Sequence, residues 1–387
     1  MNKFSKISEN LIGQKMFQIL AQAKELERQG KDVIHFEIGD PDYKTPQNIK
    51  DAGCKAIQDD HTHYTISQGL EEFRYEASKK ISISRNFLPS VEQILVTPGA
   101  NIQIYLTLLA VADPGDEIII TDPCFVSYVS IINLCNLVPI KVPLLEENNF
   151  RLSPDDLKNA ITKKTKLIII NSPNNPTGSV IKKDEMKSIY EIAEKNDIYI
   201  LSDEVYSRMV FEKGEFLSPS SFDRCNERVI VAHSFSKSHA MTGWRIGAVM
   251  GPKELIRRMT LILETITSCV SPFIQIAAIE ALTGPHPEVD KMINTLMHSR
   301  NTLVSGLNSI EGISCLSPGG SFYAFPNVSE LKMNGLEFSD YLLKESFIAT
   351  CPGAHFGDAG KNYVRFCFAT PEIKIREAID RMRLLFN

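Results

Sequence analysis

Residues 167–178 read LIIINSPNNPTG, a run of four apolar side chains followed directly by turn-forming residues. A strand that is apolar on both faces has to be covered from both sides, as happens in a parallel sheet flanked by helices. The stretch therefore predicts a buried strand over 167–170 that ends in a polar loop.

Four similar runs lie on either side of this stretch, separated by helical or polar segments. They are ILV at 94–96, III at 118–120, IYIL at 198–201 and VIV at 229–231. Their repetition predicts an α/β fold built on a mainly parallel sheet. Ligands of such open sheets bind beyond the carboxyl ends of the strands, so the residues after each run are the first candidates for function.

The two ends of the chain have a different pattern. An amphipathic helix is predicted over 15–28, and the C-terminal part combines a long helix, short strand candidates and a closing helix. We expect residues 1–45 to form the N-terminal segment of a small domain, 46–285 a large domain, and 286–387 the C-terminal part of the small domain.

The composition excludes several classes of protein. The 387-residue chain has a net charge of −5, a pI near 6.0 and no dense Lys/Arg block, so nothing predicts binding to nucleic acid or to an anionic membrane. The eight cysteines are spread without a C-x-x-C pair, so no metal site is predicted. With no signal-peptide pattern and no apolar run near the roughly 18 residues of a membrane span, we expect a cytoplasmic protein.

The segment SFSKSHAMTGWRIG, residues 234–247, follows the last of the apolar runs. Taken alone, Lys237 in this Ser-rich turn is an ordinary surface lysine. The hydroxyls of Ser234 and Ser236, together with Arg245, could instead bind a phosphate while the Lys237 amine reacts with a carbonyl.

Two further segments place polar residues at strand ends. In SDEVY, residues 202–206, Asp203 either caps a helix or pairs with a protonated ring nitrogen, and Tyr206 could donate to an oxygen on the same ring. In the loop after 167–170, Asn175 either belongs to a plain turn or orients a ligand oxygen.

A glycine turn opens the predicted helix after the run at 94–96. TPGAN places Gly99, Ala100 and Asn101 where the free N–H groups of a helix start can receive a phosphate. No G-x-G-x-x-G or P-loop pattern is present, so a nicotinamide or nucleoside triphosphate site is not predicted.

Together these segments resemble the class I/II aminotransferases of the aspartate aminotransferase superfamily, fold type I enzymes that depend on pyridoxal 5'-phosphate (PLP). The most specific match is 234–247, and NNPTG at 174–178, SDEVY at 202–206 and YVRF at 363–366 support it in consistent order. The resemblance implies a three-layer α/β/α large domain with a mainly parallel seven-stranded sheet, and a smaller α+β domain built from both chain ends.

The resemblance also implies a role for each matched residue. Lys237 would hold PLP as a Schiff base and shuttle the proton, with Asp203 at the pyridine nitrogen. The other matches are Asn175 and Tyr206 at the ring oxygen; Gly99, Ala100, Asn101, Ser234, Ser236 and Arg245 at the phosphate; Phe125 on the ring face; Tyr64 at the partner subunit's phosphate; and Gly39, Asn175 and Arg365 at the substrate.

The implied reaction is ping-pong transfer of an amino group from an L-amino acid to a 2-oxo acid, in a homodimer with shared active sites. Asn101 stands where the resembling aspartate aminotransferases carry a lysine, so we expect a neutral or aromatic amino donor. Two alternatives stay open. One is another carbanion reaction, such as a C–S β-lyase or an aminocyclopropane carboxylate synthase-like γ-elimination. The other is a PLP-binding regulatory protein, for which residues 1–30 offer no DNA-binding module.

Overall fold

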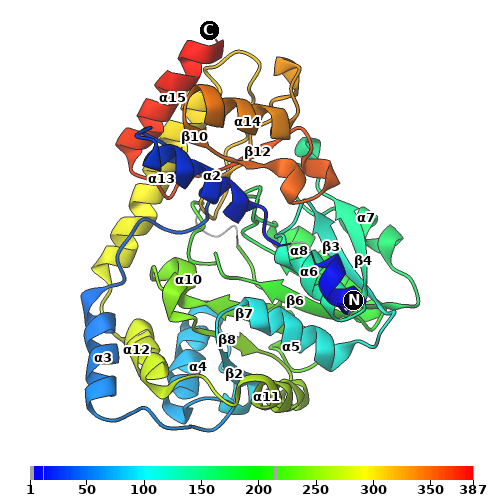
Figure 1. Ribbon diagram of the computed structural model, residues 1–387. Coiled ribbons are helices and arrows are strands. Elements are labelled where there is room, and N and C mark those ends of the chain that lie inside the picture. Colours follow the sequence, from blue (N-terminus) through cyan, green and yellow to red (C-terminus); the bar gives the residue numbers. More distant parts are fainter. Residues whose placement is uncertain (1–3, 12, 213–215, 387) are drawn as a thin grey trace.

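The computed structural model describes residues 4–11, 13–212 and 216–386. Its larger part surrounds a central sheet, and a smaller part, made of segments from both ends of the chain, lies above it in Figure 1. The long helix α13 (Pro287–Leu307) runs from one part to the other.

A seven-stranded sheet forms the centre of the larger part, in the order β2-β8-β7-β6-β5-β3-β4. The strands are β2 (Ile94–Thr97), β3 (Glu117–Asp122), β4 (Val138–Pro143), β5 (Thr165–Asn171), β6 (Tyr199–Asp203), β7 (Val229–Ser234) and β8 (Gly247–Met250). Within this sheet β8 runs antiparallel to β2 and β7, and the other pairs are parallel, which confirms the predicted sheet. The apolar runs did not include β4, an edge strand in which only Val142 is buried, or β8, a buried strand that reads GAVM.

Each face of the sheet is covered by its own layer of helices. Successive side chains of a strand point to opposite faces, so neighbouring residues pack against different layers. On β5, Ile168 and Ile170 face one layer of helices, and Leu167 and Ile169 face the other. The first layer contains α3 (Gln47–Gln58), α4 (Glu71–Arg85), α8 (Lys183–Lys195) and α12 (Pro272–Thr283); the second contains α5 (Asn101–Val111), α6 (Ser127–Leu134) and α11 (Lys253–Thr267). The three-layer α/β/α prediction is therefore confirmed.

Both ends of the chain contribute to the smaller part. β1 (Ile34–His35), from the N-terminal segment, pairs in parallel with β10 (Ile348–Ala349). The other elements are α2 (Met16–Arg28), β9 (Tyr323–Ala324), α14 (Gly335–Glu345), β11 (Cys351–Pro352), β12 (Val364–Cys367) and α15 (Glu372–Phe386). This pairing of the chain ends matches the expected α+β unit, whereas the boundaries near residues 45 and 285 stay predictions.

Three negative findings apply to the described part of the chain. No helix in it is both long and apolar enough to span a membrane. It holds no group of three or more His, Cys, Asp or Glu side chains arranged to bind a metal ion. Its cysteines are all free thiols.

Candidate active site

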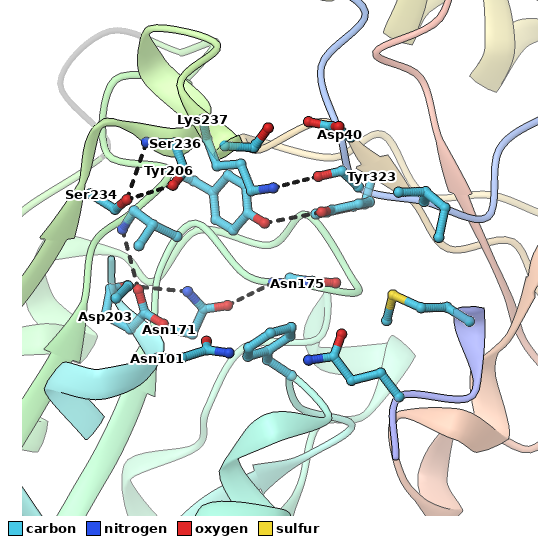
Figure 2. A pocket seen from close by; sticks show the side chains of 18 of the residues that line it. Asp40, Asn101, Asn171, Asn175, Asp203, Tyr206, Ser234, Ser236, Lys237 and Tyr323 are labelled. Carbon is cyan, nitrogen blue, oxygen red and sulfur yellow. Dashed lines mark hydrogen bonds between the residues drawn. The ribbon is translucent and has the colours of Figure 1, made fainter. Parts of the chain in front are cut away.

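A cavity of about 350 Å³ lies where β5, β6 and β7 end. Polar side chains from these strand ends meet residues of the N-terminal segment and of the smaller part across it (Figure 2). The predicted site residues that line it are Gly39, Ala100, Asn101, Phe125, Asn175, Asp203, Tyr206, Ser234, Ser236, Lys237, Arg245 and Arg365. The structure thus gathers residues that are spread over most of the sequence.

Lys237 lies on α10 (Phe235–Ser238), a short helix that begins directly after β7. Ser234 caps this helix, because its Oγ accepts a hydrogen bond from the Ser236 N–H at 3.1 Å. The Lys237 amine donates to the Gly39 carbonyl at 2.5 Å (Figure 2). Burial lowers the pKa of Lys237 to about 8, which brings the uncharged, nucleophilic amine within reach near neutral pH.

Asp203 ends β6 and is buried in the cavity wall. Tyr128 Oη donates to one carboxylate oxygen at 2.6 Å, and the Val205 N–H donates to the other at 3.3 Å. Burial raises the pKa of Asp203 to about 6, against the lowering effect of these hydrogen bonds. A protonated ring nitrogen next to the carboxylate would lower this pKa again, so the position suits a cationic heterocycle.

A phosphate-sized anion finds several donors in the same cavity. Helix α5 begins at Asn101 without a side-chain cap, so its first N–H groups remain available. Gly99 has a φ of +81°, and a Cβ there would lie 2.3 Å from an Arg245 nitrogen, so glycine is needed for Arg245 to lie against this turn. Gly99 itself lies outside the lining, and the Ser234 and Ser236 hydroxyls, 2.8 Å apart, lie within it.

Arg365, on β12, is buried at the wall formed by the smaller part. Its guanidinium donates to Asn175 Oδ1 at 3.0 Å and to the Glu37 carbonyl at 2.5 Å. It also packs against the rings of Tyr323 and Phe356, with centroids at 4.5 and 4.7 Å. Among the described residues nothing accepts a hydrogen bond from Arg365 Nε, so the side chain keeps donor capacity for a ligand carboxylate.

Tyr323 is a site residue that the sequence did not reveal. Its hydroxyl lies 3.0 Å from that of Tyr206, which orients both phenols (Figure 2). A Cβ on Gly39 would lie 2.0 Å from Tyr323 Oη, so any larger residue would collide with this ring. Residues 321–325, one of the short strand candidates of the C-terminal part, include Tyr323, and nothing in the sequence indicated the cavity.

Asn171 and Tyr128 were also missed, although both carried a weak signal. Asn171 directly ends the apolar run of β5; it accepts from the Asn175 N–H at 2.8 Å and donates to the Asp203 carbonyl at 3.1 Å. Tyr128 stands three residues after Phe125 and reaches Asp203 from α6. Asn171 thus holds Asn175 and the backbone of Asp203 in place, and Tyr128 holds the Asp203 carboxylate.

The N-terminal segment closes the cavity, which no sequence pattern indicated. Gln14, Met16 and Phe17 line it, and Gln14 Nε2 donates to Ser127 Oγ on the larger part at 3.0 Å. Tyr64, by contrast, is 88% exposed and lies outside the cavity of its own chain. Its predicted contact with a partner subunit stays a prediction.

Comparison with known proteins gives one consistent result. Residues 31–382 match the family described as "Aminotransferase class I and II". An aspartate aminotransferase of Pyrococcus horikoshii is 39% identical over 354 residues, which cover 91% of this chain and 90% of that protein. An aromatic-amino-acid aminotransferase of Thermococcus litoralis is 37% identical over 90% of each chain. The structure of an alanine aminotransferase from Pyrococcus furiosus has a TM-score of 0.94 at 32% identity and covers 99% of both chains.

Proposed function

The chain belongs to the class I and II aminotransferases, which depend on PLP, and we propose that it transfers the amino group of a neutral or aromatic L-amino acid to a 2-oxo acid by a ping-pong mechanism. The observation that carries this proposal is the meeting of the Lys237 amine, the Asp203 carboxylate and the Arg365 guanidinium in one cavity. Relatives named as aminotransferases do not favour the elimination and regulatory alternatives.

The donors and acceptors of the cavity fit PLP. An uncapped helix start suits a phosphate, and a buried carboxylate suits a pyridinium. When bound, PLP supplies a carbonyl that condenses with amines and a ring that withdraws electrons from the substrate Cα. The phosphate would be held by Ser234, Ser236, Arg245 and the N–H groups of Ala100 and Asn101, the ring nitrogen by Asp203, the ring oxygen by Asn175 and Tyr206, and the ring face by Phe125.

The remaining residues act on the substrate. Arg365 would bind the α-carboxylate through a pair of hydrogen bonds and so fix the direction of the Cα–H bond. Lys237 Nζ, whose pKa burial lowers to about 8 so that the uncharged amine dominates above that pH, accepts the proton from Cα. The Gly39 carbonyl, which accepts a hydrogen bond from this amine, holds it in the cavity.

The amino donor is inferred from the charges of the cavity. Among the described residues that line it, the cations are Lys237, Arg245 and Arg365, which serve the amine, the phosphate and the α-carboxylate. Met16 and Phe17 add apolar surface, and no further cation of the described chain faces a second carboxylate. The names of the relatives cover aspartate, aromatic and alanine donors, so the lining, and not the names, supports a neutral or aromatic side chain.

We also propose a homodimer in which each chain completes the other's site. The support is Tyr64, whose exposed phenol matches the family residue that reaches the partner's phosphate. Sedimentation velocity should show a dimer. Tyr64→Phe should weaken PLP binding and leave the dimer intact. An active monomer would reject this part of the proposal.

A panel of amino acids tests the function, each added first without an acceptor to follow the half-reaction and then with 2-oxoglutarate to complete the transfer. The long-wavelength absorbance of the bound cofactor should disappear fastest with phenylalanine, tyrosine or leucine. Preference for aspartate would reject the substrate class and leave transamination intact. Release of pyruvate and a thiol from cystathionine, without transfer of the amino group, would reject transamination itself.

A further inference from the structure

A second cavity, of about 390 Å³, lies on the other face of the sheet. Its walls come from α4, α12, β7, β8 and the loops around residues 207–208 and 216–221. Because side chains alternate along β7, Ser234 lines the catalytic cavity while His233 lines the second one, and Phe235, the first residue of α10, also lines the second cavity. One strand thus separates the two cavities.

The same short segments line both cavities. Each segment that supplies a catalytic residue turns a nearby residue to the opposite face of the sheet. The catalytic residues Asp203, Tyr206 and Lys237 are followed by Glu204, Arg208 and His239, of which Arg208 and His239 line the second cavity and Glu204 pairs with its Arg85. A ligand in the second cavity would therefore contact the chain within two residues of the catalytic groups.

One cation of the second cavity is already neutralised. Arg85 forms an ion pair with Glu204, a fully buried carboxylate that also accepts hydrogen bonds from Ser202 and Ser218. This pair satisfies both of its charges within the protein. Arg85 therefore does not need a ligand anion as its partner.

Arg208 is different. Its side chain donates to His239 Nε2 at 3.1 Å, and it forms no ion pair with a carboxylate of the described residues; Asp290 attracts it only from a longer distance. Burial holds the pKa of His239 well below its ordinary value, so this partner carries no charge. Partial burial also lowers the pKa of Arg208, because the cost of desolvating its charge outweighs the attraction of Asp290.

The rest of the cavity is mainly apolar. Ile81, Phe216, Leu217, Phe235 and Leu282 line it, and no acidic side chain does so among the described residues. Lys80 adds a second cation at an exposed position. The volume lies within the range of small-molecule sites, which combine apolar walls with a few fixed polar groups.

We propose that this second cavity binds a small organic acid with an apolar body, whose carboxylate pairs with Arg208. The anion would supply the counter-charge that no described residue provides for Arg208, and the aryl or branched alkyl group would fill the apolar wall. This site is separate from the catalytic cavity and does not depend on the proposed amino donor.

Calorimetric titration of the PLP-loaded enzyme with hydrocinnamate tests the proposal. Hydrocinnamyl alcohol serves as the uncharged probe of the same shape. The variants are Arg208→Met, the charge-preserving Arg208→Lys, and Arg365→Leu, which removes carboxylate binding from the catalytic cavity. Ser84→Trp, at an exposed position of the second cavity, should block the site without replacing any of its buried residues.

A saturable binding component should persist in Arg365→Leu and in Arg208→Lys. Arg208→Met should weaken it about tenfold or more, the effect of losing one charge-assisted hydrogen bond, and Ser84→Trp should abolish it. The alcohol should bind correspondingly more weakly. Binding that disappears in Arg365→Leu, or that survives both Arg208→Met and Ser84→Trp, would overturn the proposal.

Discussion

The two sides of the catalytic cavity are built in different ways. The side that we assign to PLP comes from neighbouring strand ends of one sheet, so that β6, β7 and the short α10 supply most of it. The side that we assign to the substrate is assembled from the N-terminal segment, β9 and β12, which are far apart in the sequence. The hydrogen-bonded ends of neighbouring strands hold the first side rigidly. The shape of the second side can change with the segments that meet there.

This contrast agrees with the spread of the relatives. Three relatives named for aspartate, aromatic and alanine donors are 39%, 37% and 32% identical to this chain. We therefore expect substitutions on the cofactor side to remove the chemistry, and substitutions on the substrate side to change affinity or preference.

Lys237→Ala should have the largest effect, because it removes both the covalent attachment and the proton acceptor. Amino-group transfer should fall about 10⁴-fold or more. Single-turnover absorbance with phenylalanine measures this, and mass spectrometry after borohydride reduction shows whether PLP stays attached. Lys163→Ala, at an exposed lysine, is the matched control. Full turnover of Lys237→Ala without an added amine would refute its role.

Asp203→Asn should lower turnover about 10³-fold, since an amide cannot balance a pyridinium charge in a buried site. In the PLP-free protein, by contrast, the same substitution should stabilise the fold. Burial raises the folded pKa of Asp203 from 3.8 to about 6, so the ionised group destabilises the fold above that pH and not below pH 3.8.

Urea denaturation of the PLP-free variant checks this second effect. Asp203→Asn should raise the free energy of unfolding at pH 8 by up to about 3 kcal/mol, the equivalent of two pKa units. The gain should shrink as the pH falls toward 4. A variant that is less stable than the wild type at pH 8 would show that the carboxylate stabilises the empty site.

Arg365→Lys tests the substrate side. Lysine keeps the charge but loses the planar pair of donors, so kcat/KM for the amino donor should fall about 10²-fold while the absorbance of bound PLP stays unchanged. Steady-state kinetics on phenylalanine and a PLP titration separate the two quantities. Equal losses of PLP affinity and of kcat/KM would show that Arg365 serves the cofactor as much as the substrate, which contradicts the division into two sides.

Asn101→Lys should shift preference and leave the chemistry in place, because the phosphate is assigned to the backbone N–H of this residue and not to its side chain. A cation at this exposed position of the lining should raise the ratio of kcat/KM for aspartate over phenylalanine by about tenfold. Asn101→Gln, which adds length without charge, is the control. An unchanged ratio would show that Asn101 does not face the substrate side chain.

His35 should give the smallest effect. Its Nδ1 lies 2.8 Å from Oε1 of buried Glu37, and this hydrogen bond raises the pKa of His35 to about 9. The stabilisation is therefore complete below pH 6.5 and is lost as the pH rises through about 9. Because His35 is partly exposed, we expect less than about 1 kcal/mol. Urea midpoints of the wild type and of His35→Gln should differ at pH 6 and converge above pH 9; a constant difference would contradict this.

Much of the cofactor side could be predicted because strand ends carry their own sequence signal. An apolar run followed by a polar turn marked Asp203, Asn175 and Lys237, and the family motifs gave them their roles. Tyr323 had no such signal, since it lies in a two-residue strand among other buried aromatic residues. Met16 and Phe17 were covered by a correct helix prediction that gave no hint of the cavity.

The sequence by itself determined five strands of the sheet, their cover of helices on both faces and the segment around Lys237, because these depend on the order of apolar and polar residues within a few positions. Only the tertiary structure decided that Tyr323 would meet Tyr206, that the N-terminal segment would close the cavity, and that half-buried Arg208 would form no ion pair with a described residue. Such contacts join residues far apart in the chain, and their energies depend on packing and burial that no local pattern encodes.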